Sequence, residues 1–321
     1  MMKVLVTGGA GFIGSNLVEK LLGDSRVSLV RVLDNLSTGS ADNIKEFLMD
    51  KRFEWIEGDI RDFETCKKAC AGIDLVSHQA ALGSVPRSIT DPLTTNAVNI
   101  TGTLNIFAAA KESDVKRVVY AASSSTYGDH PGLPKTEDKI GNPLSPYAVT
   151  KYVNELYARI YTNVYKLEMI GLRYFNIFGP RQSPNGPYAA VIPLFIRALL
   201  EKEPPTINGD GSNSRDFTYV SNAVSANMLA LFTTNPDAVG QVYNIACGEQ
   251  TSLNELFDSL KEHASSAMEA IYGPPRQGDV LHSLADISKA RQLLKYEPEI
   301  TITEGLSKTF DWYKNNRHYL K

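Results

Sequence analysis

Six short runs rich in β-branched and other apolar residues recur along the first half of the chain, and they limit the fold more than any other feature. Segments with helical apolar spacing, such as residues 14–23 and 98–113, separate these runs. Alternating strands and helices pair in parallel through right-handed crossovers. We therefore expect an α/β fold with a doubly wound parallel sheet, whose strands lie at 3–8, 28–34, 53–59, 74–80, 117–123 and 168–176.

The pattern changes after Asn176. Stretches rich in Gly, Pro and Asn, such as "INGDGSNSRDFTY", then separate helical segments at 252–264 and 286–296. We interpret this as a smaller C-terminal α/β lobe that binds the substrate. The predicted domains cover residues 1–178 and 179–321, with an approximate boundary and the possibility that segments interleave.

Charge and composition argue against several classes of protein. The chain has 33 Lys and Arg against 36 Asp and Glu, with no basic run, which speaks against a nucleic-acid surface. No apolar stretch approaches the roughly 18 residues of a membrane span, and the start "MMKVLVTGG" reads as a strand, so we expect a cytoplasmic protein without a membrane segment. Cys66, Cys70 and Cys247 lack His partners at metal spacing, and we expect buried free thiols and no metal site.

The first predicted strand ends in "TGGAGFIG", which places glycines at 8, 11 and 14. A tight turn from strand into helix requires such residues, and the exposed N–H groups at the helix start form a pyrophosphate site. Asp34 ends the second strand, 20 residues after Gly14, where a carboxylate accepts hydrogen bonds from ribose hydroxyls and repels a 2′-phosphate. This arrangement predicts a Rossmann fold that binds NAD rather than NADP, with Asp59 and Ile60 at the adenine.

Tyr147 and Lys151 are four residues apart in a helical segment that opens with "SPYAVTK". Both side chains therefore project from one face. Ionising a tyrosine near neutral pH requires about 4 kcal/mol, which we expect Lys151 and the positive nicotinamide ring to supply. Ser123, Ser124 and Ser125 end the fifth strand, so the hydroxyls and the Tyr–Lys pair should meet at the carboxyl edge of the sheet.

Several motifs together resemble the extended short-chain dehydrogenase/reductases, and within them the UDP-hexose 4-epimerases. They span nearly the whole chain: "TGGAGFIG", "LDNLSTG", "GDIRD", "HQAA", "NAVNITGTLN", "SSSTYG", "SPYAVTK", "LRYFNIFGPRQ", "RDFTYV" and "RQGDVLHSLADISKA". The sequence is most similar to the members that act on UDP-N-acetylhexosamines, the UDP-N-acetylglucosamine 4-epimerases. This resemblance implies a tightly held NAD that is regenerated in each turnover.

The resemblance also implies roles for individual residues. Tyr147, Lys151, Ser123 and Ser124 would be catalytic. The NAD would contact Gly8, Gly11, Phe12, Ile13, Gly14, Asp34, Asn35, Asp59, Ile60, Gln79, Ala80, Ala81, Asn99, Tyr147, Lys151 and Tyr174. The UDP-sugar would contact Gly83, Ser84, Ser123, Ser124, Ser125, Asn176, Arg215, Arg276, Asp279 and Ser283. His78, at the end of a strand, is expected to be structural.

The hydroxyl stretch distinguishes among the reactions of this family. Related dehydratases carry an Asp–Glu pair there and related decarboxylases a Glu, because those reactions need an acid and a base. Ser123 to Ser125 lack both, which leaves redox at C4. Gly83 and Ser84 stand where some relatives have a lysine, so the sugar contacts on that side stay open.

Two further interpretations remain at this point. A UDP-glucuronate or UDP-glucose 4-epimerase would have a similar hydroxyl stretch, and a uronate would need a cation such as Arg87 or Arg181. A dinucleotide-sensing protein without catalysis is the alternative of another class, against which the intact Ser, Tyr and Lys weigh. The resemblance further implies a homodimer through helices at about 91–111 and 145–165.

Overall fold

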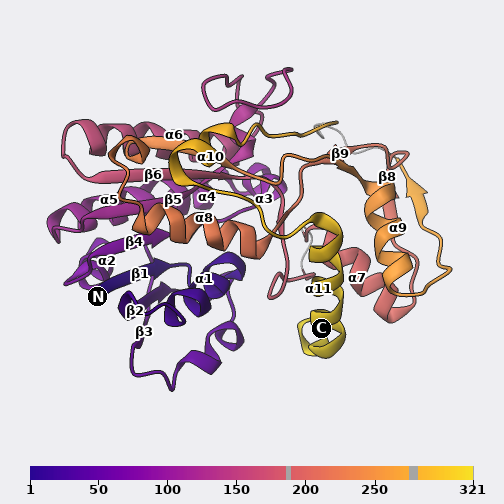
Figure 1. Cartoon of the computed structure of the whole chain (residues 1–321), viewed down its shortest axis with the longest axis horizontal. Helices are drawn as coiled ribbons and strands as arrows, with labels where there is room; N and C mark the ends of the chain where they lie inside the picture. The colour runs from indigo at the N-terminus through magenta and orange to yellow at the C-terminus, as the bar shows by residue number, and fades with distance from the viewer. Residues whose placement is uncertain (186–188, 275–280, 321) are drawn as a thin grey trace.

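The structure is a computed structural model that describes residues 1–185, 189–274 and 281–320. In this part of the chain, a seven-stranded parallel sheet has the order β11-β6-β5-β4-β1-β2-β3 (Figure 1). This confirms the predicted doubly wound α/β fold, and all six predicted strands are present. The strands of this sheet are β1 Met2–Thr7, β2 Val27–Asp34, β3 Phe53–Glu57, β4 Leu75–His78, β5 Arg117–Ser123, β6 Glu168–Tyr174 and β11 Gln241–Ile245.

Helices cover both faces of the sheet. Strand residues alternate between the faces, so Val4 and Val6 join one core cluster, together with α1 and α8, while Leu5 joins the other, together with α2 and α5. The helices are α1 Phe12–Leu22, α2 Phe63–Cys70, α3 Val85–Thr90, α4 Pro92–Asn96, α5 Thr103–Glu112 after a π-helical turn Ala97–Gly102, α6 Pro146–Asn163, α7 Val191–Glu201, α8 Val220–Phe232, α9 Leu253–His263, α10 Ser288–Leu294 and α11 Ile302–Asn315.

A smaller lobe contains short strands and lies to one side of the large sheet, with α7, α9 and α11 (Figure 1). Its sheets pair β10 with β7 and β13 with β8 in parallel, and β12 with β9 antiparallel. The short strands are β7 Ile177–Phe178, β8 Thr206–Asn208, β9 Ser214–Arg215, β10 Thr218–Tyr219, β12 Thr251–Ser252 and β13 Ile271–Gly273.

The chain returns to the large sheet after entering the smaller lobe. Strand β11 pairs in parallel with β6, and α8 packs against α1. Dividing the chain at residue 178 therefore does not separate the large-sheet domain from the smaller lobe. The division into an NAD-binding domain and a UDP-sugar-binding lobe stays a prediction, with 220–245 interleaved into the first.

Strand order reverses next to β1, which pairs with β2 on one side and with β4 on the other. Ligands of open α/β sheets bind in the crevice at such a switch point, beyond the carboxyl ends of the strands. Gly8 and Gln79 directly follow β1 and β4 and thus begin this crevice.

Two composition-based expectations can be compared with the structure. Within the described ranges, no helix combines the length and apolarity required for a membrane crossing. Cys66, Cys70 and Cys247 are free thiols. Cys66 and Cys70 are buried as expected, whereas Cys247 is only half-buried, and burial raises the pKa of all three.

Candidate active site

A cavity of about 1050 Å³ opens at the carboxyl edge of the large sheet. It extends from the first glycine turn to the segment around Ser283, across the ends of β1, β4, β5 and β6. The structure brings together most of the predicted site residues along its walls: Gly8, Gly11, Phe12, Ile13, Gly14, Asp34, Asn35, Asp59, Ile60, Gln79, Ala80, Ala81, Gly83, Ser123, Ser124, Ser125, Tyr147, Lys151, Tyr174, Asn176, Arg215 and Ser283.

The glycine turn brings backbone close to backbone at one end of this cavity. Gly8 has φ 69°, and a Cβ there would lie 2.7 Å from the Ala80 nitrogen. A Cβ on Gly14 would overlap the Gly8 carbonyl oxygen. Gly11 is the N-cap of α1 and supplies no side-chain cap, so the first N–H groups of this helix remain for a ligand. Such a helix start fits a pyrophosphate.

Asp34 is oriented by the turns on either side of it. One carboxylate oxygen accepts from Ala10 N at 2.9 Å, and the other accepts from Leu36 N at 2.8 Å. Burial raises the pKa of this carboxyl, while the two backbone hydrogen bonds lower it. A carboxylate oxygen accepts more than one hydrogen bond, so both retain capacity for ribose hydroxyls on the cavity side. The residues present therefore fit a dinucleotide.

Asp59 lines the same end and is fixed by its neighbours. It forms a 2.6 Å ion pair with Arg61 and accepts a 2.9 Å hydrogen bond from Asn35 Nδ2. The Arg61 hydrogen bond lowers the pKa of Asp59 to about 2. Asp59 is thus a fixed anion and acceptor at neutral pH, as a contact to an amino group requires.

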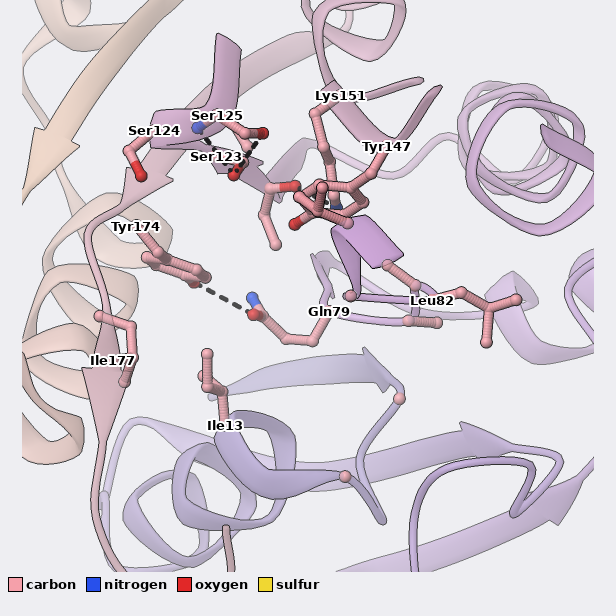
Figure 2. A pocket seen from close by; sticks show the side chains of 18 of the residues that line it. Ile13, Gln79, Leu82, Ser123, Ser124, Ser125, Tyr147, Lys151, Tyr174 and Ile177 are labelled. Carbon is pink, nitrogen blue, oxygen red and sulfur yellow. Dashed lines mark hydrogen bonds between the residues drawn. The ribbon is translucent and has the colours of Figure 1, made fainter. Parts of the chain in front are cut away.

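The hydroxyl cluster lies at the end of β5, in the 3₁₀ turn Ser124–Tyr127 (Figure 2). The Ser123 hydroxyl accepts from Ser125 N at 3.2 Å and from Ser125 Oγ at 2.9 Å. Ser123 thus both caps this turn and faces the cavity. Burial raises the pKa of Tyr147, and a side-chain hydrogen bond with Ser123 lowers it.

Lys151 follows one turn after Tyr147 on α6. Its Nζ donates to the Ala121 carbonyl at 2.8 Å and lies 5.9 Å from the centre of the Tyr147 ring. Burial lowers the pKa of Lys151 to about 8. In the structure, a side-chain hydrogen bond with Ser123 lowers the pKa of Tyr147. The expected contribution of Lys151 together with the positive nicotinamide ring stays a prediction.

A second hydroxyl is held on the floor of the cavity (Figure 2). Tyr174 donates to Gln79 Oε1 at 3.1 Å and accepts from Asn227 Nδ2 at 2.7 Å. Gln79 Nε2 in turn donates to Asn227 Oδ1 at 3.0 Å. Burial raises the pKa of Tyr174 to about 12, so it remains a neutral donor. Sequence reasoning missed Asn227, because α8 carries no motif that points to the site.

The far end of the cavity is formed by Asn176, Arg215 and Ser283. Asn176 Nδ2 donates to the Asp216 carbonyl at 3.0 Å, and an Arg215 guanidinium nitrogen donates to Leu281 O at 3.1 Å. Ser283 is half-buried, and its N–H donates to Ser214 O at 3.1 Å. The predictions for Arg276 and Asp279 lie outside the described residues.

Some predicted residues are not brought to the cavity. Asn99 is fully buried, where its side chain hydrogen-bonds both backbone groups of Leu82, which does line the cavity. Ser84 caps α3 by accepting from Arg87 N. The π-helical turn directs Asn99 inward, and Ser84 does not line the cavity, so their contacts to ligands stay predictions.

His78 is held between two threonines. Its ring nitrogens contact Thr7 Oγ1 at 2.7 Å and Thr103 Oγ1 at 2.9 Å. Burial lowers the pKa of His78 to about 3, so the ring is neutral. This agrees with the predicted structural role.

Neither arginine considered for a uronate lines the cavity. Arg181 instead pairs with Glu19 at 2.8 Å and with Glu46 at 2.5 Å. These acids fix its guanidinium against the first lobe. Sequence reasoning did not single out several further wall residues, because a motif does not show which of its side chains, or which neighbouring ones, face a cavity. They are Ser37, Thr38, Leu82, Val85, Pro86, Ile89, Tyr127, Gly128, Lys135, Leu144, Ile177 and His282.

Comparison with known proteins adds a family model and individual relatives. The model of the NAD dependent epimerase/dehydratase family matches residues 4–246. A putative UDP-glucose 4-epimerase from Methanocaldococcus jannaschii is 41% identical over 98% of this chain and 99% of its own.

Two solved structures cover both chains almost completely. The UDP-N-acetylglucosamine 4-epimerase from Methanobrevibacter ruminantium M1, in complex with UDP-N-acetylmuramic acid, is 40% identical with a TM-score of 0.92, over 98% of this chain and 99% of that one. The UDP-glucuronic acid 4-epimerase from Bacillus cereus, in complex with UDP-glucuronic acid and NAD, is 33% identical with a TM-score of 0.91, over 98% of this chain and 100% of that one.

Proposed function

Since this chain belongs to the NAD-dependent epimerase/dehydratase family and is a UDP-sugar 4-epimerase that uses NAD, we propose that it interconverts UDP-N-acetylglucosamine and UDP-N-acetylgalactosamine. The observation that carries this choice is Ser283, a small residue in the cavity wall. Glucose-type members of the resembled group have a bulky tyrosine at this point. A serine leaves room for a 2-acetamido group.

The residues of the chain support a proton-transfer role around C4 of the sugar. Bound NAD would supply the acceptor, and then the donor, of the hydride at C4. Tyr147 accepts the proton of the 4-hydroxyl and later gives it back, while Ser123 donates to the oxygen on which charge develops. Because burial favours the neutral phenol, Ser123 and the charges that arrive with the ligands must favour the phenolate.

Inversion at C4 requires the 4-keto sugar to rotate while its nucleotide stays bound. Arg215 supports this anchoring, because its guanidinium lies in the wall beside Ser283 and suits a diphosphate. Arg276 and Asp279 remain proposed as further diphosphate and ribose contacts. The described acids of the cavity wall, Asp34 and Asp59, both lie at the cofactor end, so an elimination that needs acid and base at the sugar is disfavoured.

The alternatives lose support from the same geometry. Neither Arg87 nor Arg181 reaches the cavity, so the cation expected for a uronate is not supplied by either of them. The dinucleotide-sensing alternative has no use for a half-buried Tyr147 beside Ser123 and Lys151 in the cavity wall.

Incubation with UDP-N-acetylglucosamine, UDP-glucose and UDP-glucuronic acid, each followed by chromatography for its C4 epimer, tests the proposal. We expect the acetylated sugar to give its epimer at the highest kcat/KM. A clear preference for either of the other two would replace the proposed substrate, and no epimer from any of them would contradict the activity.

Purified protein should contain NAD without any being added, because a cofactor that is regenerated in each turnover gains nothing from exchange. The measurement is the absorbance and enzymatic assay of the supernatant after denaturation, with one NAD per chain as the upper limit. Protein that contains none and stays inactive after NAD is added would contradict the mechanism.

We also propose a homodimer through α6 and its neighbours. Exposed apolar side chains form a stripe along this helix and its C-cap residue, with Leu93 of α4 beside it. The exposed fraction of Ile160 is 49% and that of Leu93 is 82%, which is unusual for large apolar residues on a surface that stays in water. The stripe consists of Val149, Leu156, Tyr157, Ile160 and Val164.

Replacing Ile160 with Glu should convert the dimer into a monomer, since the substitution places a charge in the centre of the stripe. Light scattering after size exclusion measures the mass. Met49→Glu is a matched control, because Met49 is 91% exposed on a different part of the surface and should leave the mass unchanged. A wild-type monomer, or an unchanged dimer in Ile160→Glu, would exclude this interface.

The cytoplasm remains our proposed compartment, because free thiols are characteristic of a reducing environment.

A further inference from the structure

The carboxylate of Asp216 is completely buried directly behind the cavity wall and does not line the cavity. One oxygen accepts from Cys247 N at 3.0 Å. The other accepts from Gly248 N at 3.0 Å and from Ala285 N at 3.2 Å. Cys247 and Gly248 follow β11 of the large sheet, whereas Ala285 belongs to the segment that contains Ser283. A single side chain thus joins three parts of the chain.

The backbone of Asp216 also contacts a fourth part of the chain, the segment at Asn176. Its carbonyl oxygen accepts the 3.0 Å hydrogen bond from Asn176 Nδ2. Asn176 has φ 39°, in the left-handed region that most residues avoid, so its conformation depends on such tertiary contacts. The orientation of the Asn176 side chain in the cavity wall is therefore set from Asp216.

The Ser283 segment is attached to β9 along its length. Ser214 N donates to Leu281 O at 3.0 Å, Ser283 N donates to Ser214 O at 3.1 Å, and Ala285 N reaches the Asp216 carboxylate. Arg215 lies between Ser214 and Asp216 and also donates to Leu281 O. Asp216 thus anchors one end of the strip of chain from which Ser283 and Arg215 face the cavity.

We propose that Asp216 is a positioning residue for UDP-sugar binding, which holds Asn176, Arg215 and the Ser283 segment in their binding arrangement before the substrate arrives. This inference rests on the proposed function, since it takes those three residues as substrate contacts. Ordering a cavity wall during binding costs free energy. A wall that is already ordered avoids this cost, so the nucleotide sugar binds more tightly.

The chemistry of the pocket around Asp216 agrees with this role. Three backbone N–H groups donate to its oxygens, and removing these acceptors would leave the donors unpaired, which is unfavourable. Burial, with a smaller contribution from the nearby Glu249, raises the pKa of Asp216 to about 7, although the three backbone hydrogen bonds lower it. The side chain is kept at this unfavourable place although it touches neither ligand nor solvent.

The test measures binding and turnover separately in Asp216→Ala and Asp216→Asn. Titration calorimetry gives the Kd of UDP, and steady-state kinetics give KM and kcat for UDP-N-acetylglucosamine. For Asp216→Ala we expect Kd and KM to rise by about 10-fold or more, the effect of losing one hydrogen bond to a charged group. Asn retains one acceptor oxygen, so Asp216→Asn should be intermediate. We expect kcat at saturation to change little, because Ser123 and Tyr147 belong to β5 and α6.

Leu260→Ala is the control for a general loss of stability. Leu260 is fully buried in α9 of the smaller lobe and does not line the cavity. This variant should lower the melting temperature while leaving the Kd of UDP unchanged. Equal Kd values in the wild type and Asp216→Ala, or a fall in kcat with unchanged Kd and KM, would overturn the proposal. If Asp216→Ala does not fold, Asp216→Asn decides whether Kd and KM rise, as the proposal expects, or stay unchanged.

The Kd of UDP does not depend on turnover. An enzyme that binds UDP but does not epimerise UDP-N-acetylglucosamine would therefore contradict the proposed function, while the Asp216 variants would still decide this proposal.

Discussion

Tyr147→Phe should reduce kcat by a factor of about 100 or more and leave the NAD content of the protein unchanged. The ring hydroxyl is the only group removed, and it is the one that the mechanism assigns to proton transfer at the 4-oxygen. Burial raises the pKa of Tyr147, while Ser123 lowers it through a side-chain hydrogen bond. The measurement is kcat for UDP-N-acetylglucosamine together with NAD released on denaturation.

Two comparisons give this result a clear meaning. Tyr165→Phe removes the hydroxyl of a residue that is 50% exposed just beyond α6, and it should leave kcat unchanged. Ser123→Ala removes the hydrogen bond that lowers the pKa of Tyr147, so the pKa rises and the activity that requires the phenolate should appear at higher pH than in the wild type. Near-normal turnover in Tyr147→Phe would place the proton transfer elsewhere.

Ser283→Tyr should lose activity on the acetylated UDP-sugars and keep or gain it on UDP-glucose and UDP-galactose. A tyrosine fills the volume that the 2-acetamido group needs while the 4-keto sugar rotates. Forcing extra atoms into a packed site costs about 1–3 kcal/mol, and discrimination by bulk is roughly 10 to 200-fold in kcat/KM.

The structure explains why the backbone at Ser283 cannot easily move to relieve this crowding. Ser283 N is hydrogen-bonded to Ser214 O, and the neighbouring His282 ring is hydrogen-bonded to Ser214 Oγ at 2.8 Å through Nδ1. The new side chain must therefore occupy the cavity rather than displace the wall.

The measurement is kcat/KM for both sugar pairs in the wild type, Ser283→Tyr and Ser283→Ala. Ser283→Ala is the matched control, because it keeps the small volume and should keep the preference for acetylated sugars. Equal losses on acetylated and plain sugars in Ser283→Tyr would show that bulk at this position does not select the substrate.

The two proposals concern different properties of one strip of chain. Ser283 sets how much volume the sugar has, and Asp216 sets how firmly the strip is held. A variant of Ser283 should therefore change the ratio of kcat/KM values between substrates. A variant of Asp216 should instead weaken the binding of all UDP-sugars and of UDP alike. Measuring UDP alongside the sugars separates the two effects.

The sequence by itself determined the parts of the protein that depend on local spacing. The alternation of strands and helices predicted the large sheet. The glycines at 8, 11 and 14 with Asp34 predicted the cofactor end, because all four belong to one strand–helix–strand unit. Tyr147 and Lys151 could be paired from their spacing on a single helix. In each case the geometry follows from φ/ψ preferences and hydrogen bonds between near neighbours.

Only the tertiary structure decided the features that join distant segments. Sequence reasoning missed β11, which completes the large sheet, and Asn227, which orients Tyr174 from 53 residues away. The hydrogen bond with Ser123 that lowers the pKa of Tyr147 likewise joins two different elements, β5 and α6. Burial, and contacts between residues such as Asp216 and Ala285 that are 69 positions apart, arise only when separate elements pack. No local pattern encodes them, because their partners are chosen by the fold as a whole.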